Sequence, residues 1–193
     1  DEMNRQFDDA IIVADVGQHQ MFVAQYAEIT EKKQMIMSGG LGTMGYGFPG
    51  AIGAQLGNPD KKVIAVSGDG GMQMNIQELA TIMQSHVGVK IVLLNNNYLG
   101  MVRQWQELFY NRRYSFTDML SPEYSLIARA NEVGYELVEK LEDHDGPIAQ
   151  MLECPDASLL EVRVEKEAEM FPMVPAGAAV YDMVRKSDIA GAP

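Results

Sequence analysis

Two polar motifs, each placed after an apolar run, contain the residues with the clearest chemical potential. Residues 68–71 read GDGG after the run 62–66, and residues 95–97 read NNN after the run 89–94. Asn96 follows Asp69 by 27 positions, a spacing that allows one strand-helix-strand crossover to bring both residues to neighbouring strand ends. One carboxylate, one amide oxygen and a loop carbonyl form an oxygen-only set, which suits Mg²⁺ or Ca²⁺.

The glycines around Asp69 point to a phosphate-bearing ligand. Mg²⁺ commonly completes its coordination with phosphate oxygens. Gly68, Gly70 and Gly71 would let main-chain N–H groups approach such oxygens, and the helix predicted to follow adds its positive amino end. A bare Gly-Asp-Gly is usually only a turn. The specific signal is the whole order of strand, GDGG, helix, strand and paired asparagines.

Alternating apolar runs and helical patterns predict the elements that position these motifs. The pattern indicates an α/β fold, an open doubly wound parallel sheet flanked by helices. Another helix is expected after the loop that follows Gly17. The predicted strands are residues 10–14, 35–37, 62–66, 89–94, 135–138 and 159–164, and the predicted helices are 48–56, 72–85, 99–110, 122–133, 145–153 and 180–185.

The chain shows no internal repeat or convincing domain boundary. We expect a single domain over residues 1–193, with 169–193 as a C-terminal tail over its surface. A chain of this length can bury about two thirds of its unfolded surface, so neither a disulfide nor a metal is required for folding.

Ligands of open parallel sheets bind beyond the carboxyl ends of the strands. Four loops meet that description: 17–19, 39–47, 68–71 and 95–100.

The net charge and composition indicate which partners and which compartment to expect. A formal net charge of -12 opposes binding to nucleic acid or to an anionic membrane, so we expect neither partner. No run of 18 apolar residues occurs, and residues 1–5 lack the features of a signal peptide. The single Cys154 has no internal disulfide partner and suits a reducing compartment. These features predict a cytoplasmic protein. The 14 methionines fill the core or supply an adaptable apolar lining.

Longer motifs carry a family resemblance. GDGGMQMN followed by LLNNN resembles the metal-binding signature of thiamin-diphosphate enzymes. DVGQHQMF, SGGLGTMGYGFPGAIGAQLG and NYLGMVRQWQELFYNRRYS are similar to the C-terminal thiamin-diphosphate-binding domain of the acetolactate synthase (acetohydroxyacid synthase) large catalytic subunit. The resemblance covers nearly the whole chain.

The resemblance implies a role for each matching residue. It implies that Mg²⁺ is held by Asp69, the Asn96 side chain and the Tyr98 main-chain carbonyl. It implies cofactor contacts of three kinds: with the diphosphate for Gln18, His19, Gly68, Gly70 and Gly71; with the aminopyrimidine ring for Gly42, Thr43 and Met44; and along the pocket wall for Met101. The indole of Trp105 would line the pocket for the second ketoacid. Without this context, a lone Trp is more often a core residue and an isolated His more often structural. No catalytic residue is assigned.

The implied reaction is a transfer that depends on thiamin diphosphate and Mg²⁺, in branched-chain amino-acid biosynthesis. Pyruvate is decarboxylated and joined to a second 2-ketoacid, either pyruvate or 2-ketobutyrate. In the family, an activating glutamate comes from the pyrimidine-binding domain of a second subunit, and FAD binds mainly outside this domain. We therefore expect a homo-oligomer, with a regulatory small subunit as a further partner. We expect these 193 residues by themselves to be inactive.

Two other interpretations stay open. The chain is alternatively the small subunit of a split thiamin-diphosphate 2-ketoacid decarboxylase or oxidoreductase, although such proteins are not expected to carry GMVRQWQELFY. It is alternatively a non-catalytic module for oligomerisation or for binding a regulatory subunit, with an exposed apolar surface. One departure from the family is Gly71-Met72, where related sequences often have a small residue and Phe; this conservative change should not disturb metal binding.

Overall fold

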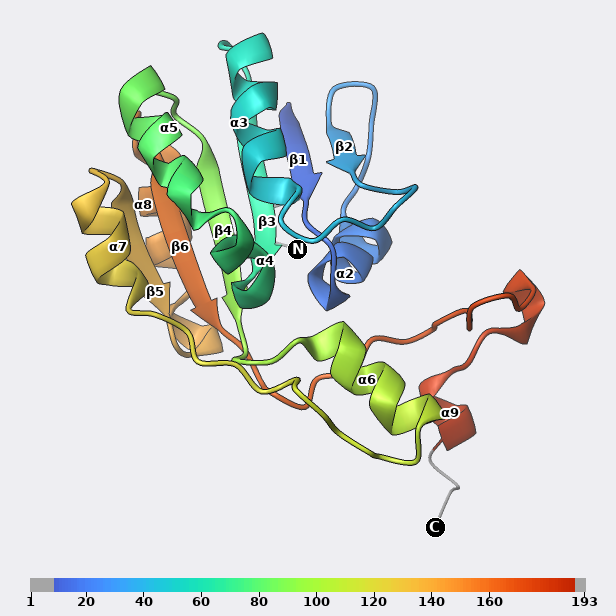
Figure 1. Cartoon of the computed structure of the whole chain (residues 1–193). Helices are drawn as coiled ribbons and strands as arrows, with labels where there is room; N and C mark the ends of the chain where they lie inside the picture. Colours follow the sequence, from blue (N-terminus) through green and yellow to red (C-terminus); the bar gives the residue numbers. More distant parts are fainter. Residues whose placement is uncertain (1–8, 190–193) are drawn as a thin grey trace.

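Six parallel strands form one sheet in the computed structural model, which describes residues 9–189 (Figure 1). Their order across the sheet is β2-β1-β3-β4-β6-β5. Each strand falls on a predicted apolar run, and the predicted open parallel sheet is confirmed. The strands are β1 (Ala10–Ala14), β2 (Gln34–Met37), β3 (Lys62–Gly68), β4 (Lys90–Asn95), β5 (Gly134–Val138) and β6 (Ser158–Arg163). Residues 1–8 and 190–193 of the predicted domain lie outside the described residues.

Helices cover both faces of the sheet. One face packs against α3 (Gly47–Gly57), α5 (Leu79–Ser85) and α7 (Tyr124–Ala130), and the other against α2 (Gln18–Tyr26) and α8 (Asp145–Glu153). The layering confirms the doubly wound arrangement. In the described part of the chain, no helix has the length and apolar character needed to cross a membrane. The remaining helices are α4 (Asp69–Met74), α6 (Gly100–Phe109) and α9 (Lys186–Ile189), with short 3-10 turns η1 (Ile76–Glu78), η2 (Leu141–Asp143) and η3 (Val180–Asp182).

The buried strands contribute side chains to two hydrophobic cores, one on each side of the sheet. Because successive side chains of a strand point to opposite faces, Ile11 and Val13 join the core under α3, whereas Ile12 joins the core under α2. Every residue of β1 is buried, as expected for a central parallel strand covered on both faces.

The predicted helix over 72–85 was wrong in its boundaries. Helical structure already begins at Asp69, and it is interrupted at Asn75, whose φ of -132° is not helical. The Asn75 side chain instead donates to the Gly45 carbonyl oxygen at 2.7 Å. A tertiary hydrogen bond to the glycine loop has therefore outweighed the continuous helical periodicity, and the second half of the predicted helix is α5.

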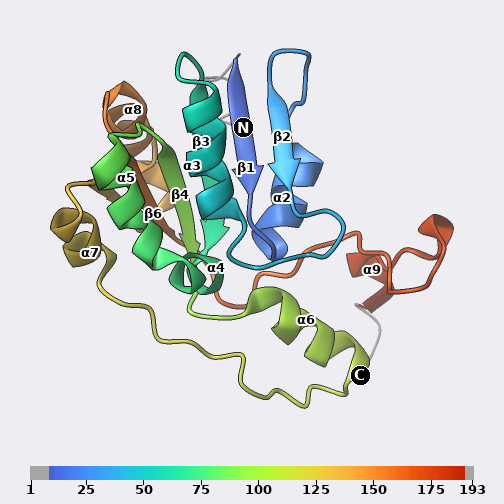
Figure 2. The ribbon, with the colours of Figure 1, turned by 45° about the horizontal axis from the view of Figure 1, so that its top comes forward.

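The helix predicted over 180–185 was also wrong. Only the single 3-10 turn η3 forms there, because Val184 pairs with Met173 in an antiparallel bridge with N···O distances of 2.7 and 3.0 Å. Within the predicted tail, the described residues 169–189 contain η3, α9 and this bridge. Figure 2 shows this segment and α6 lying beyond the carboxyl ends of the strands, apart from the layered body.

The connections create a switch point between β1 and β3. After β1 the chain passes through α2 to β2 at the sheet edge, and then returns through α3 on the opposite face to β3. The loops that leave β1 and β3 therefore diverge to opposite faces, which opens a crevice at the carboxyl ends of these strands. The motifs that contain Gly17 and Asp69 leave the sheet at this point.

The buried carboxylate of Asp15 joins three segments beside the switch point. Its two oxygens accept hydrogen bonds from the Gly45 main-chain N–H at 2.9 and 3.1 Å. The Ser67 hydroxyl donates to the same carboxylate at 3.0 Å, and the Val16 N–H donates at 2.7 Å. Asp15 is fully buried, so these donors replace the water that it loses on folding. The carboxylate therefore fixes the end of β1, the end of β3 and the 39–47 loop relative to one another.

This packing predicts that a side chain added at position 71 destabilises this chain. A Cβ added to Gly71 would lie 2.0 Å from Asp15 Oδ2, whereas one added to Gly53 in α3 would meet no atom within 4 Å. We expect Gly71→Ala to lower the free energy of unfolding by about 2 kcal/mol or more, through overpacking against a buried carboxylate. Gly53→Ala is the matched control and should stabilise by roughly 0.5–1 kcal/mol. Urea denaturation followed by circular dichroism measures both, and equal stability of the two variants would contradict the expectation.

Candidate metal and cofactor site

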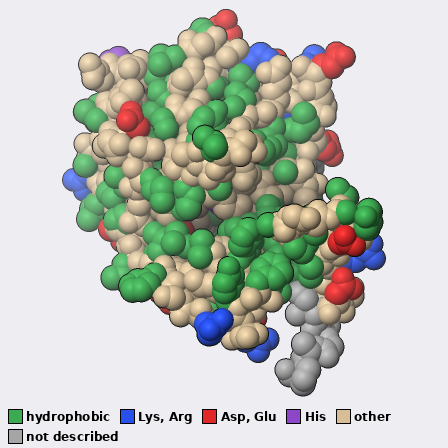
Figure 3. Space-filling view, turned by 45° about the vertical axis from the view of Figure 1, so that its right-hand side comes forward, with side chains coloured by type: hydrophobic (Ala, Val, Ile, Leu, Met, Phe, Trp, Pro, Cys, Tyr) green, Lys and Arg blue, Asp and Glu red, His purple; other side chains and the backbone are tan. Residues whose placement is uncertain are grey.

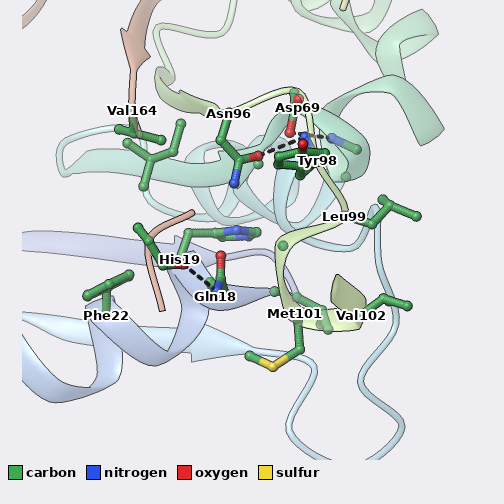
Figure 4. Close-up of a pocket in the computed structure, with 18 of the residues that line it drawn as sticks. Gln18, His19, Phe22, Asp69, Asn96, Tyr98, Leu99, Met101, Val102 and Val164 are labelled. Carbon is green, nitrogen blue, oxygen red and sulfur yellow. Dashed lines mark hydrogen bonds between the residues drawn. The ribbon is translucent and has the colours of Figure 1, made fainter. Parts of the chain in front are cut away.

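A cavity of about 300 Å³ lies at the carboxyl ends of the strands, at the switch point (Figure 4). It is lined by residues from segments far apart in sequence: 16–19 after β1, 68–71 at the end of β3, Leu94, Asn96 and 98–102 at and beyond the end of β4, and Val164, Glu165 and Ala168 after β6. Both α2 and α6 begin at the cavity, so their positive amino ends face it. The cavity therefore suits an anionic ligand.

Asp69 and Asn96 lie at one end of this cavity. The Asp69 side chain is only 1% exposed; its Oδ1 accepts from the Gly70 N–H at 3.1 Å, and the Ser121 hydroxyl lies 3.2 Å from its Oδ2. Burial raises the pKa of the Asp69 carboxyl, and hydrogen bonds from Gly70 and Ser121 partly oppose that rise. A divalent cation would compensate for the cost of keeping this buried group ionised.

The loop that carries Asn96 and Tyr98 is held in a fixed turn. Asn96 Oδ1 accepts from the Tyr98 N–H at 3.0 Å (Figure 4). Asn97 adopts a left-handed conformation with φ of 56°, which asparagine tolerates better than most residues. The segment 117–119 clamps this loop, since Leu99 N–H donates to the Thr117 carbonyl at 2.8 Å and Met119 N–H to the Asn97 carbonyl at 2.9 Å. The three predicted metal ligands thus line one cavity.

The three predicted ligands differ in type from the His and Cys side chains that usually hold a transition metal. Among residues 9–189, no group of three or more His, Cys, Asp or Glu side chains is placed to hold a metal ion. One carboxylate, one amide and a main-chain carbonyl leave positions that a phosphate-bearing ligand and water can complete, as Mg²⁺ prefers.

His19 places an unpartnered polar atom in the same cavity. Its side chain is 8% exposed, and its Nε2 is buried with no hydrogen-bond partner in the described structure. The ring packs tightly against two glycines, because a Cβ on Gly17 or Gly68 would lie 2.7 or 3.1 Å from His19 Cε1. The other ring nitrogen is engaged by the main chain of Asp15. A buried polar atom normally has a partner. Because Nδ1 keeps the proton of the neutral ring, Nε2 would donate to a diphosphate oxygen only when the negative charge of the ligand raises the pKa of His19 and the ring takes up a second proton.

Gln18 also lines the cavity, but its amide group is already engaged. Its Nε2 donates to Gln104 Oε1 at 2.9 Å and to the Ala168 carbonyl at 2.8 Å. Gln104 is 2% exposed, and it bonds to both the N–H and the carbonyl of Met170 at 3.0 and 2.8 Å. Gln18 therefore joins α2 to α6 and to the 168–170 segment, and donation to a phosphate would require it to exchange one of these bonds. Sequence reasoning missed Gln104, because its neighbours in sequence give no sign of its partners.

The other predicted residues divide between the cavity and its surroundings. The cavity is lined by Met44, Gly68, Gly70, Gly71 and Met101, but not by Gly42, Thr43 or Trp105. Gly42 and Thr43 lie in the turn that leads to Met44, where the Thr43 N–H donates to Ser38 Oγ at 3.1 Å. Gly42 has φ of 62°, a conformation that favours glycine.

Trp105 lines a second cavity of about 650 Å³ on α6. Its side chain is 41% exposed and packs edge-to-face on Phe109, with ring centroids 6.2 Å apart. Met101 and Val102 line both cavities, so the two are neighbours along one helix. Hydrophobic side chains are prominent across the lower half of the face drawn in Figure 3. A core role for Trp105 is therefore excluded within this chain.

The buried His19 predicts a dependence of stability on pH. Burial lowers its pKa from 6.5 to about 4, against the opposing influence of Asp15. Between these values the unfolded chain binds more protons than the folded chain. His19 therefore leaves the free energy of unfolding unchanged well above pH 6.5 and lowers it as the pH falls. At pH 5 the cost is about 2 kcal/mol. We expect His19→Asn to lose that much less stability than the unsubstituted protein between pH 7.5 and 5, measured by urea denaturation without ligands. Parallel pH profiles would contradict this expectation.

Known proteins similar to this chain include three that are named acetolactate synthase. The acetolactate synthase isozyme 2 large subunit of Escherichia coli (strain K12) is 40% identical over 179 residues, which are 92% of this chain and 33% of that protein. The acetolactate synthase large subunit of Lactococcus lactis subsp. lactis (strain IL1403) is 46% identical over 180 residues, 91% of this chain and 31% of that protein. Acetolactate synthase 1, chloroplastic, of Nicotiana tabacum is 43% identical over 188 residues, which are 93% of this chain and 28% of that protein. The chain thus spans about a third of the length of these curated relatives.

A family model gives the broader relationship. The model described as "Thiamine pyrophosphate enzyme, C-terminal TPP binding domain" matches residues 15–162. The match begins at Asp15, ends in β6 and includes both motifs that contain Asp69 and Asn96. Since it covers most of the chain, the chain belongs to the thiamine pyrophosphate enzymes as a C-terminal TPP-binding domain.

Proposed function

We propose that this chain anchors thiamin diphosphate through Mg²⁺ for the acetolactate synthase reaction, the decarboxylation of pyruvate and its carboligation to a second 2-ketoacid. The observation that carries the proposal is the shared cavity of Asp69, Asn96 and the unpartnered His19 Nε2. It offers oxygen ligands for a cation at one end and groups for an anion beside them. The similarity to acetolactate synthase large subunits supports this reaction over others in the family.

Each group of residues has a distinct task in this proposal. Asp69, Asn96 and the Tyr98 carbonyl would hold Mg²⁺, and the aminopyrimidine ring would lie against Gly42, Thr43 and Met44. When bound, thiamin diphosphate supplies the electron sink that allows a 2-ketoacid to lose carbon dioxide. The chain's own residues orient this group and exclude water from it. The diphosphate would contact Gln18, His19, Gly68, Gly70 and Gly71.

The apolar face of α6 would form the substrate side of the site. Met101 lies on the cofactor cavity and on the cavity that Trp105 lines, so it would line the path between cofactor and second ketoacid. The Trp105 indole would favour the longer alkyl chain of 2-ketobutyrate over that of pyruvate. One methylene in an apolar pocket contributes roughly 1–3 kcal/mol to such a choice.

The rim of the site suits a partner in a homo-oligomer. Leu41 lies in the loop that leads to Met44, and Phe116 and Leu120 flank the segment that bonds to Asn97 and Leu99. Each is more than 90% exposed, and exposed large apolar side chains near a site support an interaction surface there. We propose the pyrimidine-binding domain of a second subunit as the partner there. FAD would bind mainly outside this domain, a regulatory small subunit would be a further partner, and the protein would act in branched-chain amino-acid synthesis in the cytoplasm.

The cation proposal predicts the behaviour of Asp69→Asn. Loss of the carboxylate should weaken Mg²⁺-dependent binding of thiamin diphosphate by more than about 100-fold, beyond the usual cost of losing an outer partner of a metal ligand. Stability without Mg²⁺ should be unchanged or higher, because the amide relieves the burial cost that raises the pKa of Asp69.

Titration calorimetry and urea denaturation together test this prediction, with Asp60→Asn, an exposed change remote from the cavity, as the control. Retained Mg²⁺-dependent binding in Asp69→Asn would contradict the proposed cation site. Binding of a protein partner by a chain that takes up no cofactor would instead favour a non-catalytic module.

A second prediction concerns the 193 residues by themselves. The proposed activating glutamate comes from another domain, and no described residue of this chain is assigned its role. We therefore expect the purified polypeptide to bind Mg²⁺ and thiamin diphosphate without producing acetolactate from pyruvate. Colorimetric measurement of acetolactate tests this directly, and turnover near that of a whole acetolactate synthase would contradict the proposed division of roles.

A further inference from the structure

A series of hydrogen-bonded polar side chains, buried or partly buried, runs from the far edge of the sheet to Asp69. It begins at Tyr135 on β5, passes through Glu161 on β6 and Asn95 at the end of β4, and reaches Ser121 in the loop before α7. Tyr135, Glu161 and Asn95 share one face of the sheet, because Glu161 pairs with Leu93 on β4 and with Leu137 on β5. None of these three side chains belongs to the cavity lining.

Glu161 determines which of its neighbours' atoms act as hydrogen-bond donors. Its side chain is 3% exposed, and an ionised carboxylate can only accept hydrogen bonds. Tyr135 Oη donates to Oε2 at 2.7 Å and Asn95 Nδ2 donates to Oε1 at 2.8 Å. Arg163 Nε lies 3.6 Å from Oε1, so a positively charged group faces the same carboxylate. Both neighbours must therefore present donors to Glu161.

This constraint fixes which way the Asn95 amide points. With Nδ2 committed to Glu161, Oδ1 faces the other side, where it accepts from the Asn97 N–H at 3.2 Å and meets Ser121 Oγ at 3.1 Å. A reversed amide would place its NH₂ group against the Asn97 N–H, donor against donor. Asn95 therefore braces the first turn of the loop that carries Asn96.

Ser121 links Asn95 to Asp69 through its hydroxyl group. Its hydroxyl lies 3.2 Å from Asp69 Oδ2, and its main-chain N–H donates to Asn97 Oδ1 at 3.2 Å. The hydroxyl has one proton for two acceptors, so it can serve the Asp69 carboxylate or the Asn95 amide oxygen. Together with the Gly70 N–H on Oδ1, it fixes the plane of the carboxylate and leaves the lone pairs toward the cavity available for a cation.

We propose that Glu161 is a positioning residue for the cation site, acting through Asn95 and Ser121 on the orientation of Asp69. This inference rests on the proposed function of Asp69 as a Mg²⁺ ligand. Glu161 touches neither cation nor substrate in this scheme. Its effect is a preorganised carboxylate, and losing such an outer partner typically lowers metal affinity by roughly 10–100-fold.

The test compares variants of Glu161 in the protein at its native full length. Glu161→Met removes the acceptor and leaves the Asn95 amide free to turn, so we expect the Kd for Mg²⁺ to rise by roughly 10–100-fold at saturating thiamin diphosphate. Glu161→Gln should restore affinity to within about 3-fold, because its Oε1 can still accept from Asn95 while its Nε2 donates to Tyr135 Oη. Titration calorimetry with MgCl₂ supplies the Kd, and circular dichroism verifies folding.

A second position keeps the test decisive if Glu161→Met does not fold. Ser121→Ala should weaken Mg²⁺ binding to a similar degree, and Ser121→Thr should retain the hydroxyl and the affinity. Where Glu161→Met folds, the double variant with Ser121→Ala should be no weaker than the worse single variant, because both act along one chain. Gln55→Met is the matched control. Gln55 is also buried, and it donates to the Asn58 and Lys61 carbonyls just before β3 begins, at the end of the strands opposite to Asp69.

The outcomes separate this inference from the proposed function. Wild-type affinity in Glu161→Met or in Ser121→Ala, equal weakening by Glu161→Met and Glu161→Gln, or equal weakening by Gln55→Met would each overturn the positioning role while leaving the cation site intact. Absence of Mg²⁺-dependent binding in the unsubstituted protein would overturn the proposed function and the positioning role together.

Discussion

The structure of the site depends on the burial of one carboxylate, that of Asp15. A carboxylate without water must be surrounded by donors, or its desolvation would cost several kcal/mol. The donors here come from Val16, Gly45 and Ser67, each in a different segment. Satisfying one side chain therefore fixes three loops relative to one another. Gly71 must lack a side chain for the same reason, because Asp15 Oδ2 occupies the space that a Cβ would need.

A second buried carboxylate, Glu161, acts on the other side of the GDGG segment. Asp15 holds this segment through Ser67, just before it, while the chain from Glu161 reaches Asp69 itself through Asn95 and Ser121. The two networks approach from different strands and both end on residues of this segment or next to it. Because the two networks hold the segment from both sides, it has little freedom to change shape. Buried polar networks that are fully paired specify geometry in this way.

The sequence predicted the sheet and the principal loops because those features follow from local patterns. Six apolar runs became six strands, and loops rich in glycine and asparagine ended at the expected edge. The errors have a tertiary cause. Asn75 leaves the helix to bond with Gly45, and Val184 pairs with Met173. Periodicity contains no information about such partners, so it extended one helix through Asn75 and placed another across Val184.

The same distinction applies to the candidate site. Asp69, Asn96 and Tyr98 were found from motifs, and they line one cavity as the motifs implied. Gln104 and Glu161 were missed, because their importance comes from partners 66 positions away, Met170 and Asn95. Gln18 was identified, yet its engagement with Gln104 and Ala168 could not be anticipated. A motif thus identifies which residues face a ligand, whereas the buried side chains that orient them become visible only when the strands are placed side by side.

The two ends of the site consequently differ in how their geometry is specified. At the polar end, both Asp69 carboxylate oxygens and Asn96 Oδ1 lie within hydrogen-bond distance of a donor in this chain, so these proposed cation ligands are oriented by the chain itself. At the apolar end, Trp105 and Met101 are held by packing on a single helix, and Trp105 remains partly exposed. Packing of this kind tolerates changes in shape better than a directed hydrogen bond does. Evolution of substrate preference should therefore act through α6, while changes in the network around Asp69 should alter cofactor affinity before they alter the choice of ketoacid.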